Sequence, residues 1–352
     1  MRIAVDAMGG DHAPQCAVEG AVRAAREDGA DVLLVGDRAR VEAELARLGA
    51  PAGASDLRIE VVHAEEVVGM DEPAITPIRK KRRSSIRLAA QLVKEDVAQA
   101  MVTAGNTGAA MIAAKMVIGT IPGVDRPALA AVLPNARGRT VLLDVGANVD
   151  TKPAQLREFA VMGHFFAQEV IGMRSPRIGL MSIGEEEGKG TDLTREVFKV
   201  LKKTGLNFIG NVEGRDVFNG EADVIVCDGF VGNVLLKSAE SLAELFGRML
   251  REEMSRSPRI RAGYLLAKPA FDAFRSRTDY SEYGAAPLLG VNGGCFIGHG
   301  SSNAHAVQNA IRRAVEFSAA SLANKIRDKV AELHSQEERL LSGVAGHHEA
   351  AG

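Results

Sequence analysis

Six turns in the sequence combine glycine with polar side chains that could bind an anion. They are Asp6–His12, Thr103–Gly108, Asp144–Asp150, Ile183–Gly190, Cys227–Asn233 and Gly298–Asn303. Glycine lets the backbone approach a ligand closely, and a helix that follows such a turn presents unpaired N–H groups to negative charge. A single turn of this kind is commonly structural, but their recurrence predicts a polar crevice that accepts an anion.

Several side chains in these turns could act on a reacting group. Lys189 lies between two glycines, which favours a phosphate or oxyanion partner. His12 and His299 lie beside glycines in two other turns. Four asparagines occur where strands end, namely Asn106, Asn148, Asn211 and Asn233. Each could form a local Asx turn, but their recurrence favours a shared ligand network.

The same turns lack the motifs of common cofactors. The run Glu185–Glu187 could hold Mg²⁺, but a solvated acidic turn is the more common use of such a run. Gly184–Gly190 lacks the Walker spacing. No Gly-x-Gly-x-x-Gly follows the first strand, and no Cys-x-x-Cys indicates zinc. We therefore expect no metal site and no cofactor.

Alternating strand and helix patterns must position these turns. Short apolar runs predict strands at Ile3–Asp6, Val32–Gly36, Leu57–Val62, Ala100–Thr103, Val141–Asp144, Ile178–Ser182, Phe208–Gly210 and Val224–Cys227. Longer patterns predict helices at Cys16–Glu27, Arg38–Leu48, Ser84–Lys94, Thr107–Val117, Pro153–Val170, Leu193–Lys203 and Asn303–Glu332. This alternation favours a three-layer α/β/α fold with a mainly parallel sheet. The six turns would then share the edge where strands end, which is where ligands bind in such folds.

Composition places the 352-residue chain among ordinary globular proteins. Hydrophobic residues make up 46% and charged residues 25%, and the net charge of −2 points to no nucleic-acid partner. Three scattered cysteines exclude a disulfide-stapled scaffold, and no apolar run is long enough to span a membrane. The first residues predict a strand rather than a signal peptide. We expect one large α/β domain at 1–334 and a disordered tail at 335–352.

Residues 240–283 interrupt the strand–helix rhythm. An apolar stripe at helical spacing is formed by Leu242, Leu245, Phe246, Met249 and Leu250. A second apolar set is Tyr264, Leu265, Leu266, Phe271 and Phe274, which lies among Arg256, Arg259, Arg261, Lys268, Arg275 and Arg277. The stripe fits a dimer interface or a lid, and the basic, apolar second set fits an element that binds a membrane surface or an acyl chain.

Arg79–Arg83 is a second concentration of positive charge. It could be a solvated surface, or it could bind phosphate or an acidic protein.

The ordered motifs resemble one family, the acyl-[acyl carrier protein]:phosphate acyltransferases, or PlsX family. The matching stretches are Met1–Pro14, Ala104–Gly108, Asp144–Asp150, Ile183–Gly190, Ile209–Asp216, Cys227–Lys237, Tyr283–Gly293 and His299–Ser302. The resemblance implies a fold like that of isocitrate and isopropylmalate dehydrogenases and phosphate acetyltransferases. It also implies a homodimer that transfers a fatty acyl group from acyl carrier protein to inorganic phosphate. The acyl phosphate would pass to a membrane glycerol-phosphate acyltransferase, a further expected partner.

Read together with the resemblance, the turns give a set of expected site residues. We expect catalytic roles for Lys189, Asn233 and His12. The expected substrate-binding residues are Gly9, Gly10, Asp11, Gly105, Asn106, Thr107, Asp144, Asn148, Glu185, Asn211, Asp228, His299 and Ser301. We expect a cytoplasmic protein that associates reversibly with anionic membranes through residues 240–283.

Two alternatives come from other functional classes. A metal- and NAD-dependent 2-hydroxy acid dehydrogenase on the same fold would need a nicotinamide site and several Asp ligands. A binding module for RNA or for a carrier protein would depend on Arg79–Arg83.

Overall fold

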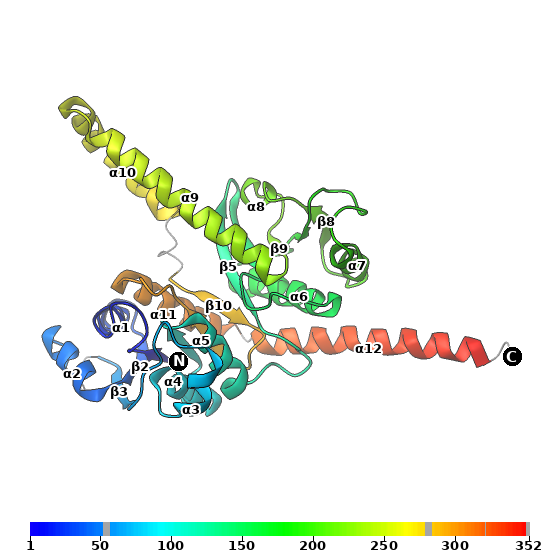
Figure 1. The fold of residues 1–352 in the computed structure, drawn as a ribbon, viewed down its shortest axis with the longest axis horizontal. Helices are drawn as coiled ribbons and strands as arrows, with labels where there is room; N and C mark the ends of the chain where they lie inside the picture. Colours follow the sequence, from blue (N-terminus) through cyan, green and yellow to red (C-terminus); the bar gives the residue numbers. More distant parts are fainter. Residues whose placement is uncertain (52–56, 279–283, 321, 350–352) are drawn as a thin grey trace.

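The computed structural model describes residues 1–51, 57–278, 284–320 and 322–349, with only the backbone described for 272–278 and 337–349. Figure 1 shows two lobes joined by one sheet, with a helical hairpin and a long C-terminal helix projecting from them. Residues 279–283, at the end of the predicted excursion, lie outside the described part.

One mixed sheet runs through both lobes. In the described residues it has eleven strands in the order β3-β2-β1-β4-β11-β10-β5-β6-β9-β7-β8. The strands are β1 Arg2–Asp6, β2 Asp31–Gly36, β3 Ile59–His63, β4 Ala100–Thr103, β5 Ala128–Asn135, β6 Gly138–Leu143, β7 Ile178–Met181, β8 Phe208–Val212, β9 Val224–Val226, β10 Ala286–Leu289 and β11 Gly294–Ile297. The predicted strands occur within a few residues of these bounds.

The sheet is parallel except at its centre. β10 pairs antiparallel with both β11 and β5, and β5 pairs antiparallel with β6. All other named pairs are parallel. Strands β5, β10 and β11 are absent from our sequence prediction. Of these, β5 and β10 join the two parallel halves.

Helices cover both faces of the sheet. Their bounds are α1 Gln15–Glu27, α2 Arg38–Arg47, α3 Ile75–Lys80, α4 Ser85–Lys94, α5 Thr107–Ala113, α6 Pro153–Glu169, α7 Asp192–Leu201, α8 Asp216–Asn219, α9 Gly229–Ser255, α10 Pro258–Thr278, α11 Ala304–Ala319 and α12 Leu322–Glu349. A π-helical turn, Ala114–Ile118, continues α5.

The apolar core lies on both sides of the sheet. Alternate residues of β1 and β2 divide between two buried clusters: Ala4 and Leu33 face the side of α4 and α5, whereas Ile3 and Val32 face the side of α1 and α11. In the other lobe, α6, α7 and α12 contribute to a third cluster. This alternation is expected for strands buried on both faces.

Two predicted elements differ from the structure, and a third is found where it was predicted. The single helix predicted at Asn303–Glu332 is two helices, because α11 ends at Ala319 and α12 begins at Leu322. Helix α12 continues to Glu349 over residues where composition predicts a disordered tail. Helices α9 and α10 occupy the predicted excursion and contact each other along the hairpin (Figure 1).

Candidate functional site

Three glycine turns meet at the carboxyl ends of β1, β4 and β11, and we call their residues 6–13, 103–108 and 298–303 the first cluster. The N–H of Asp11 donates to the carbonyl oxygen of Gly300 at 2.8 Å. A Cβ on Gly9 would lie 2.7 Å from the amide nitrogen of Gly105, so the first two turns can touch only because Gly9 has no side chain. The cluster contains nine of the predicted site residues: Gly9, Gly10, Asp11, His12, Gly105, Asn106, Thr107, His299 and Ser301.

Asp6 joins two of these turns beneath the surface. Its side chain is nearly fully buried, and it accepts hydrogen bonds from the Thr103 hydroxyl at 2.8 Å and the Met8 N–H at 3.1 Å. Burial raises the pKa of the Asp6 carboxyl, while hydrogen bonds from Ser85 and Thr103 oppose the rise. Thr103 Oγ1 in turn accepts from the N–H of Gly105 at 3.0 Å. Asp6 therefore holds the β1 and β4 turns in register.

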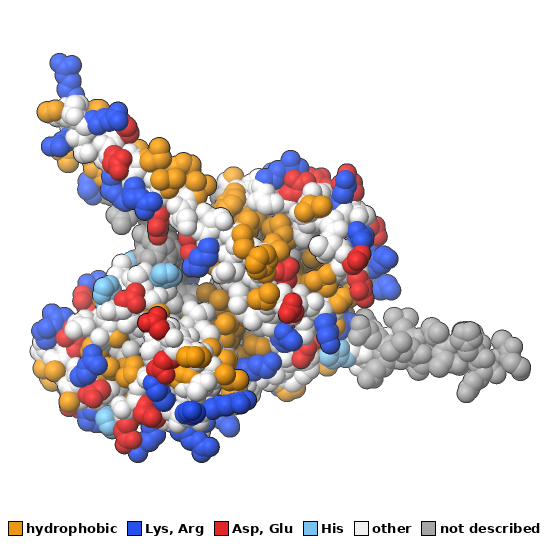
Figure 2. Space-filling model, viewed as in Figure 1, with side chains coloured by type: hydrophobic (Ala, Val, Ile, Leu, Met, Phe, Trp, Pro, Cys, Tyr) orange, Lys and Arg blue, Asp and Glu red, His pale blue; other side chains and the backbone are white. Residues whose placement is uncertain are grey.

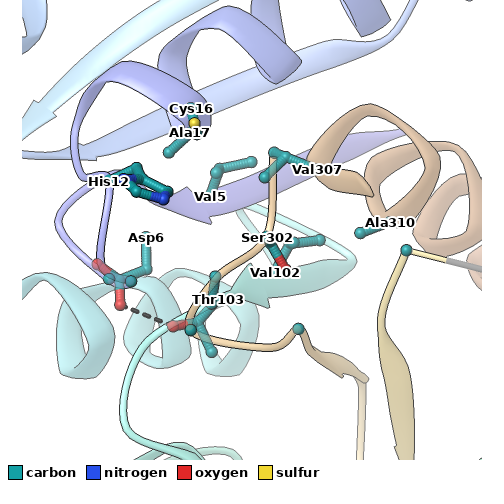
Figure 3. A pocket seen from close by; sticks show the side chains of 16 residues that line it. Val5, Asp6, His12, Cys16, Ala17, Val102, Thr103, Ser302, Val307 and Ala310 are labelled. Carbon is teal, nitrogen blue, oxygen red and sulfur yellow. Dashed lines mark hydrogen bonds between the residues drawn. The ribbon is translucent and has the colours of Figure 1, made fainter. Parts of the chain in front are cut away.

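A small pocket opens between these turns and the first turns of α1 and α11. Its lining includes Asp6, His12, Cys16, Thr103 and Ser302. Figure 3 shows His12 and Ser302 on opposite sides of the pocket, with the Asp6 carboxyl turned toward Thr103. Ser302 is only 5% exposed, and its hydroxyl has no hydrogen-bond partner within the described residues. A buried, unpaired donor beside two helix N-termini suits an anionic ligand.

Asn106 fixes the edge of the first cluster nearest α3. Its Oδ1 caps α5 by accepting from the N–H of Ala109 at 3.0 Å. Its Nδ2 lies within hydrogen-bond distance of the carbonyl oxygens of Met70 and Glu72, both at 2.9 Å, and of Gly69 at 3.3 Å. Asn106 thus couples the β4 turn to the loop before α3. Of the two roles considered for the asparagines, Asn106 therefore has the local structural one, in which the side chain bonds to nearby backbone.

The second cluster follows β6 and β9 and contains the predicted residues Asp144, Asn148, Asp228 and Asn233. The fully buried Asp144 carboxyl accepts from four donors: the N–H groups of Leu129 (2.9 Å), Ala147 (3.1 Å) and Asn148 (2.7 Å), and Asn148 Nδ2 (2.9 Å). Burial raises the pKa of Asp144, and these donors oppose the rise. Asp144 is therefore a structural anchor for the turn.

Helix α9 begins against this turn. Asp228 caps it by accepting from the N–H of Val231 at 2.9 Å, and the N–H of Gly229 donates to the Asn148 carbonyl oxygen at 2.7 Å. Asn233 follows on the exposed side, next to Gly146. The start of α9 thus places the exposed Asn233 amide beside the turns that follow β6 and β9.

The third cluster follows β7 and β8 and contains Glu185, Lys189 and Asn211. Glu185 pairs with Arg215 at 2.7 Å, and Asn211 Nδ2 donates to the Glu186 carbonyl oxygen at 2.8 Å. Asn211 is 6% exposed and its Oδ1 has no partner among the described residues. The exposed Lys189 donates its backbone N–H to the Glu186 carbonyl oxygen at 3.0 Å. Its side chain makes no hydrogen bond or ion pair within the described part of the chain, so the ammonium group is available to a ligand.

The expectation that all six turns share one edge of the sheet is wrong. Three antiparallel pairs, β11–β10, β10–β5 and β5–β6, reverse the strand direction, so the carboxyl ends of β6, β9, β7 and β8 point the opposite way from those of β1, β4 and β11. β10 and β5 stand between the strands of the first cluster and those of the other two, so His12 and Lys189 belong to different halves. The sequence analysis did not single out Ser302, Thr103 or Cys16 as site residues. The available signal for Ser302 was its place in the glycine turn directly before the cap of α11.

Within the residues the structure describes, no group of three or more His, Cys, Asp or Glu side chains is placed to hold a metal ion. The same residues include no helix long and apolar enough to cross a membrane.

The fold has counterparts among solved structures. A phosphotransacetylase from Streptococcus pyogenes superposes with a TM-score of 0.62 at 18% identity, covering 90% of this chain and 94% of that one. A 4-hydroxythreonine-4-phosphate dehydrogenase from Klebsiella pneumoniae gives 0.51 at 16% identity, covering 90% and 99%. The likeness to phosphate acetyltransferases in fold is confirmed, whereas the likeness to isocitrate and isopropylmalate dehydrogenases stays a prediction.

The sequence comparisons define the class more narrowly. The model of the family described as "Fatty acid synthesis protein" matches residues 1–325. A phosphate acyltransferase of Geotalea uraniireducens is 54% identical over 332 residues, which are 94% of this chain and 95% of the relative. One of Geotalea daltonii is 51% identical over 350 residues, 98% and 100% of the two chains. The chain belongs to this family, the PlsX phosphate acyltransferases, as its motifs predict.

Proposed function

We propose that this enzyme transfers a fatty acyl group from acyl carrier protein to inorganic phosphate, without a metal or a nucleotide. The family membership supports this activity. The observation that carries it in the structure is the pocket of the first cluster, where glycine turns, two helix N-termini and the unpaired Ser302 hydroxyl meet. Such a site favours an oxyanion over a nicotinamide ring.

The chemistry requires positioning more than a strong base. A phosphate oxygen attacks the thioester carbonyl carbon, the C–O bond forms, the C–S bond breaks, and the carrier thiolate leaves and takes up a proton. Phosphate is already ionised near neutral pH. Holding both reactants together supplies much of the rate enhancement. Each well-placed donor to the developing oxyanion contributes about 3 kcal/mol.

Three exposed side chains are our candidates for contact with the reacting groups. Lys189 supplies an ammonium group without an intramolecular partner in the described residues, and Asn233 supplies an amide at the start of α9. His12 lines the pocket of the first cluster. Because sheet order separates His12 from the other two, we assign His12 to the phosphate side and Lys189 and Asn233 to the thioester side.

The direct test is incubation with acyl carrier protein thioester and phosphate, with acyl phosphate trapped by hydroxylamine. We expect a trapped hydroxamate that depends on phosphate and persists after treatment with EDTA. Complete loss of activity in EDTA, restored by Mg²⁺, would contradict the metal-free mechanism. The dehydrogenase alternative predicts instead that NADH forms from a 2-hydroxy acid, and the comparisons do not favour it.

We propose that acyl carrier protein docks beside α3, since the family's carrier is an acidic protein. Figure 2 shows Lys and Arg side chains gathered over this part of the molecule. Lys81 pairs with Glu72, and Arg83 pairs with Glu65 at 2.8 Å. Arg79 and Arg82 are exposed and make no ion pair with the described residues. The surface adjoins the first cluster, because Asn106 bonds to the loop that precedes α3.

Charge reversal tests this docking surface. We expect Arg79→Glu with Arg82→Glu to weaken carrier binding and to flatten its dependence on ionic strength, because long-range attraction between opposite charges is screened by salt. The matched control reverses two exposed lysines, one on α7 and one in the turn that follows it, Lys199→Glu with Lys203→Glu. If both double variants bind the carrier like the parent at low and high salt, α3 is only a solvated surface.

We also propose that α9 forms the interface of a homodimer. Its apolar stripe is exposed in the single chain, from 41% at Leu250 to 60% at Phe246. Figure 2 shows hydrophobic side chains exposed on the projecting hairpin. Exposed apolar surface of this extent marks an interaction site. Sedimentation should show a dimer that Phe246→Glu converts to a monomer, and an unchanged dimer would contradict the assignment.

The end of the hairpin fits reversible contact with an anionic membrane. Leu265 and Leu266 on α10 are 68% and 86% exposed, close to Arg259 and Arg261. Phe274, Arg275 and Arg277 belong to the same predicted set, but their side chains lie outside the described residues. Apolar side chains anchor such contacts, and each basic residue near anionic lipid adds about 1 kcal/mol. A cytoplasmic enzyme held in this way would release acyl phosphate near its membrane acyltransferase.

Flotation with phosphatidylglycerol vesicles tests the membrane proposal. We expect the parent protein to float at low salt, and Leu265→Glu with Leu266→Glu to abolish flotation while the dimer persists. If the double variant becomes monomeric, these leucines belong to the dimer interface. If the parent protein does not float, the membrane proposal is wrong.

A further inference from the structure

We infer that the Ser302 hydroxyl donates a hydrogen bond to inorganic phosphate, which binds at the mouth of the pocket in the first cluster. The inference rests on the proposed function and assigns the acceptor substrate to one of the three clusters. It concerns a residue that lies in the His299–Ser302 motif but is not among the expected site residues.

The first argument is the unused hydroxyl. Only 5% of the surface of Ser302 is exposed, yet its Oγ has no hydrogen-bond partner within the described residues. Its backbone is fixed, since its N–H donates to the His299 carbonyl oxygen at 2.9 Å. Leaving a buried polar group unpaired is unfavourable, so a rigid, unpaired hydroxyl that lines a pocket indicates a ligand.

The second argument is the local field. Ser302 directly precedes the cap of α11, a helix of 16 residues, and Cys16 and Ala17 from the first turn of α1 line the same pocket. Helices α1 and α11 pack closely against each other. The positive ends of both helix dipoles therefore lie at the pocket, which favours binding of an anion there. His12 adds an imidazole opposite Ser302 (Figure 3).

Nearby carboxylates do not exclude an anion here. Both oxygens of Asp6 already accept hydrogen bonds, from Met8 N–H and from Thr103 Oγ1. Burial also raises the pKa of Asp6, which favours its neutral form. The Asp11 carboxyl lies near Gly300, and because Asp11 is exposed, water screens its charge.

The size of the pocket determines how phosphate binds. Its cavity volume is about 20 Å³, which accommodates one water-sized group. One phosphate oxygen can therefore enter and accept from Ser302, while the remaining oxygens stay at the mouth. This arrangement leaves an outer oxygen directed away from the pocket, free to attack a thioester.

The test compares Ser302→Ala with Ser318→Ala, which removes a serine hydroxyl from the other end of α11. We expect Ser302→Ala to raise the KM for phosphate about tenfold or more, the size of a hydrogen bond to a charged group. The KM for acyl carrier protein should not change. Ser302→Cys, which keeps the size of the side chain but is a weak donor, should behave like Ser302→Ala. Ser318→Ala should behave like the parent protein.

Binding of inorganic phosphate alone separates this inference from the proposed reaction. Phosphate should raise the Tm of the parent protein by mass action, and Ser302→Ala should lose this rise while keeping the parent's Tm in phosphate-free buffer. Phosphate-dependent stabilisation that survives in Ser302→Ala, or a change in the KM for the acyl carrier only, would overturn the inference. A parent protein that binds phosphate through Ser302 but forms no acyl phosphate would contradict the proposed function and leave the site intact.

Discussion

The contact between α9 and the β6 turn allows a sharp test of how the second cluster is built. Gly232 lies in the first turn of α9, and a Cβ added there would be 1.8 Å from the carbonyl oxygen of Asp144 and 2.9 Å from Cys227 Sγ. Real Cβ contacts are not shorter than 3.0 Å, so Gly232→Ala must move the helix from the turn by at least 1.2 Å. The obstructing atom is backbone and cannot rotate away.

The magnitude follows from two opposing effects. Alanine favours a helix over glycine by up to about 1 kcal/mol, but overpacking of this kind costs about 1–3 kcal/mol and occasionally more. We therefore expect Gly232→Ala to lower the free energy of unfolding by about 1–3 kcal/mol. Because Asn233 is the next residue, a displacement near 1 Å should also lower kcat, by about 100-fold if Asn233 acts on the reacting groups.

Gly247→Ala is the matched control on the same helix. Its added Cβ would meet only Arg251 Nη1, at 3.6 Å, so this substitution should stabilise the protein by about 0.5–1 kcal/mol. Urea unfolding gives both free energies, and the hydroxamate assay gives kcat. If Gly232→Ala is as stable as Gly247→Ala, the close approach of α9 to Asp144 is wrong.

Three further substitutions test the other parts of the site. Lys189→Ala should lower turnover about 100-fold or more if its charge stabilises the transition state, with Lys203→Ala as the exposed control; a folded Lys189→Ala enzyme with normal turnover would remove Lys189 from the mechanism. Asn106→Asp keeps the oxygen that caps α5 but lacks the donor to the loop before α3, so hydrogen exchange should quicken in that loop and stay unchanged in α5. Asp144→Asn should cost about 1–3 kcal/mol in urea unfolding, because an amide nitrogen would face donors that now bond to a carboxylate; an unchanged midpoint would contradict the four-donor geometry.

Most of the parallel strands could be predicted because their signal is local. Runs such as Asp31–Gly36 concentrate β-branched and apolar residues over a few positions. The central strands have no such signal. β5 begins Ala-Leu-Ala-Ala, and β10 contains a proline and two leucines in four residues. Their pairing joins residues about 160 positions apart, Leu129 with Leu288, which a local pattern cannot indicate.

The end of α11 is a second case where local patterns were insufficient. The residues before Leu322 include no glycine or proline, so helical periodicity continues through the point where the chain turns. The turn is instead a result of packing: α11 lies on the α1 side of the first lobe, whereas α12 packs against α6 in the second. One straight helix could not reach both.

The candidate site was predictable only in part. The rule that ligands bind where parallel strands end placed each polar turn at the end of its own strand, but it wrongly predicted one shared edge, since the two parallel halves run in opposite directions. It could not show that the antiparallel β10 and β5 separate the first cluster from the other two. For the same reason, sequence alone gave no basis for assigning phosphate and thioester to different halves.

The sequence analysis interpreted the glycines as positions where the backbone approaches a ligand. In the structure, their main role is to let the turns pack against each other. At Gly9 and Gly232 an added side chain would first meet another turn of the same protein, the backbone of Gly105 or of Asp144. Close packing of turns against each other and against α9 therefore accounts for glycine at these positions, before any ligand is considered. The packed turns then bury polar groups, and some of these, such as Asp6 and Asp144, are paired internally. A group that remains unpaired at the centre of such an arrangement, as the Ser302 hydroxyl does, is a more selective indicator of ligand binding than the glycine motif that led to it.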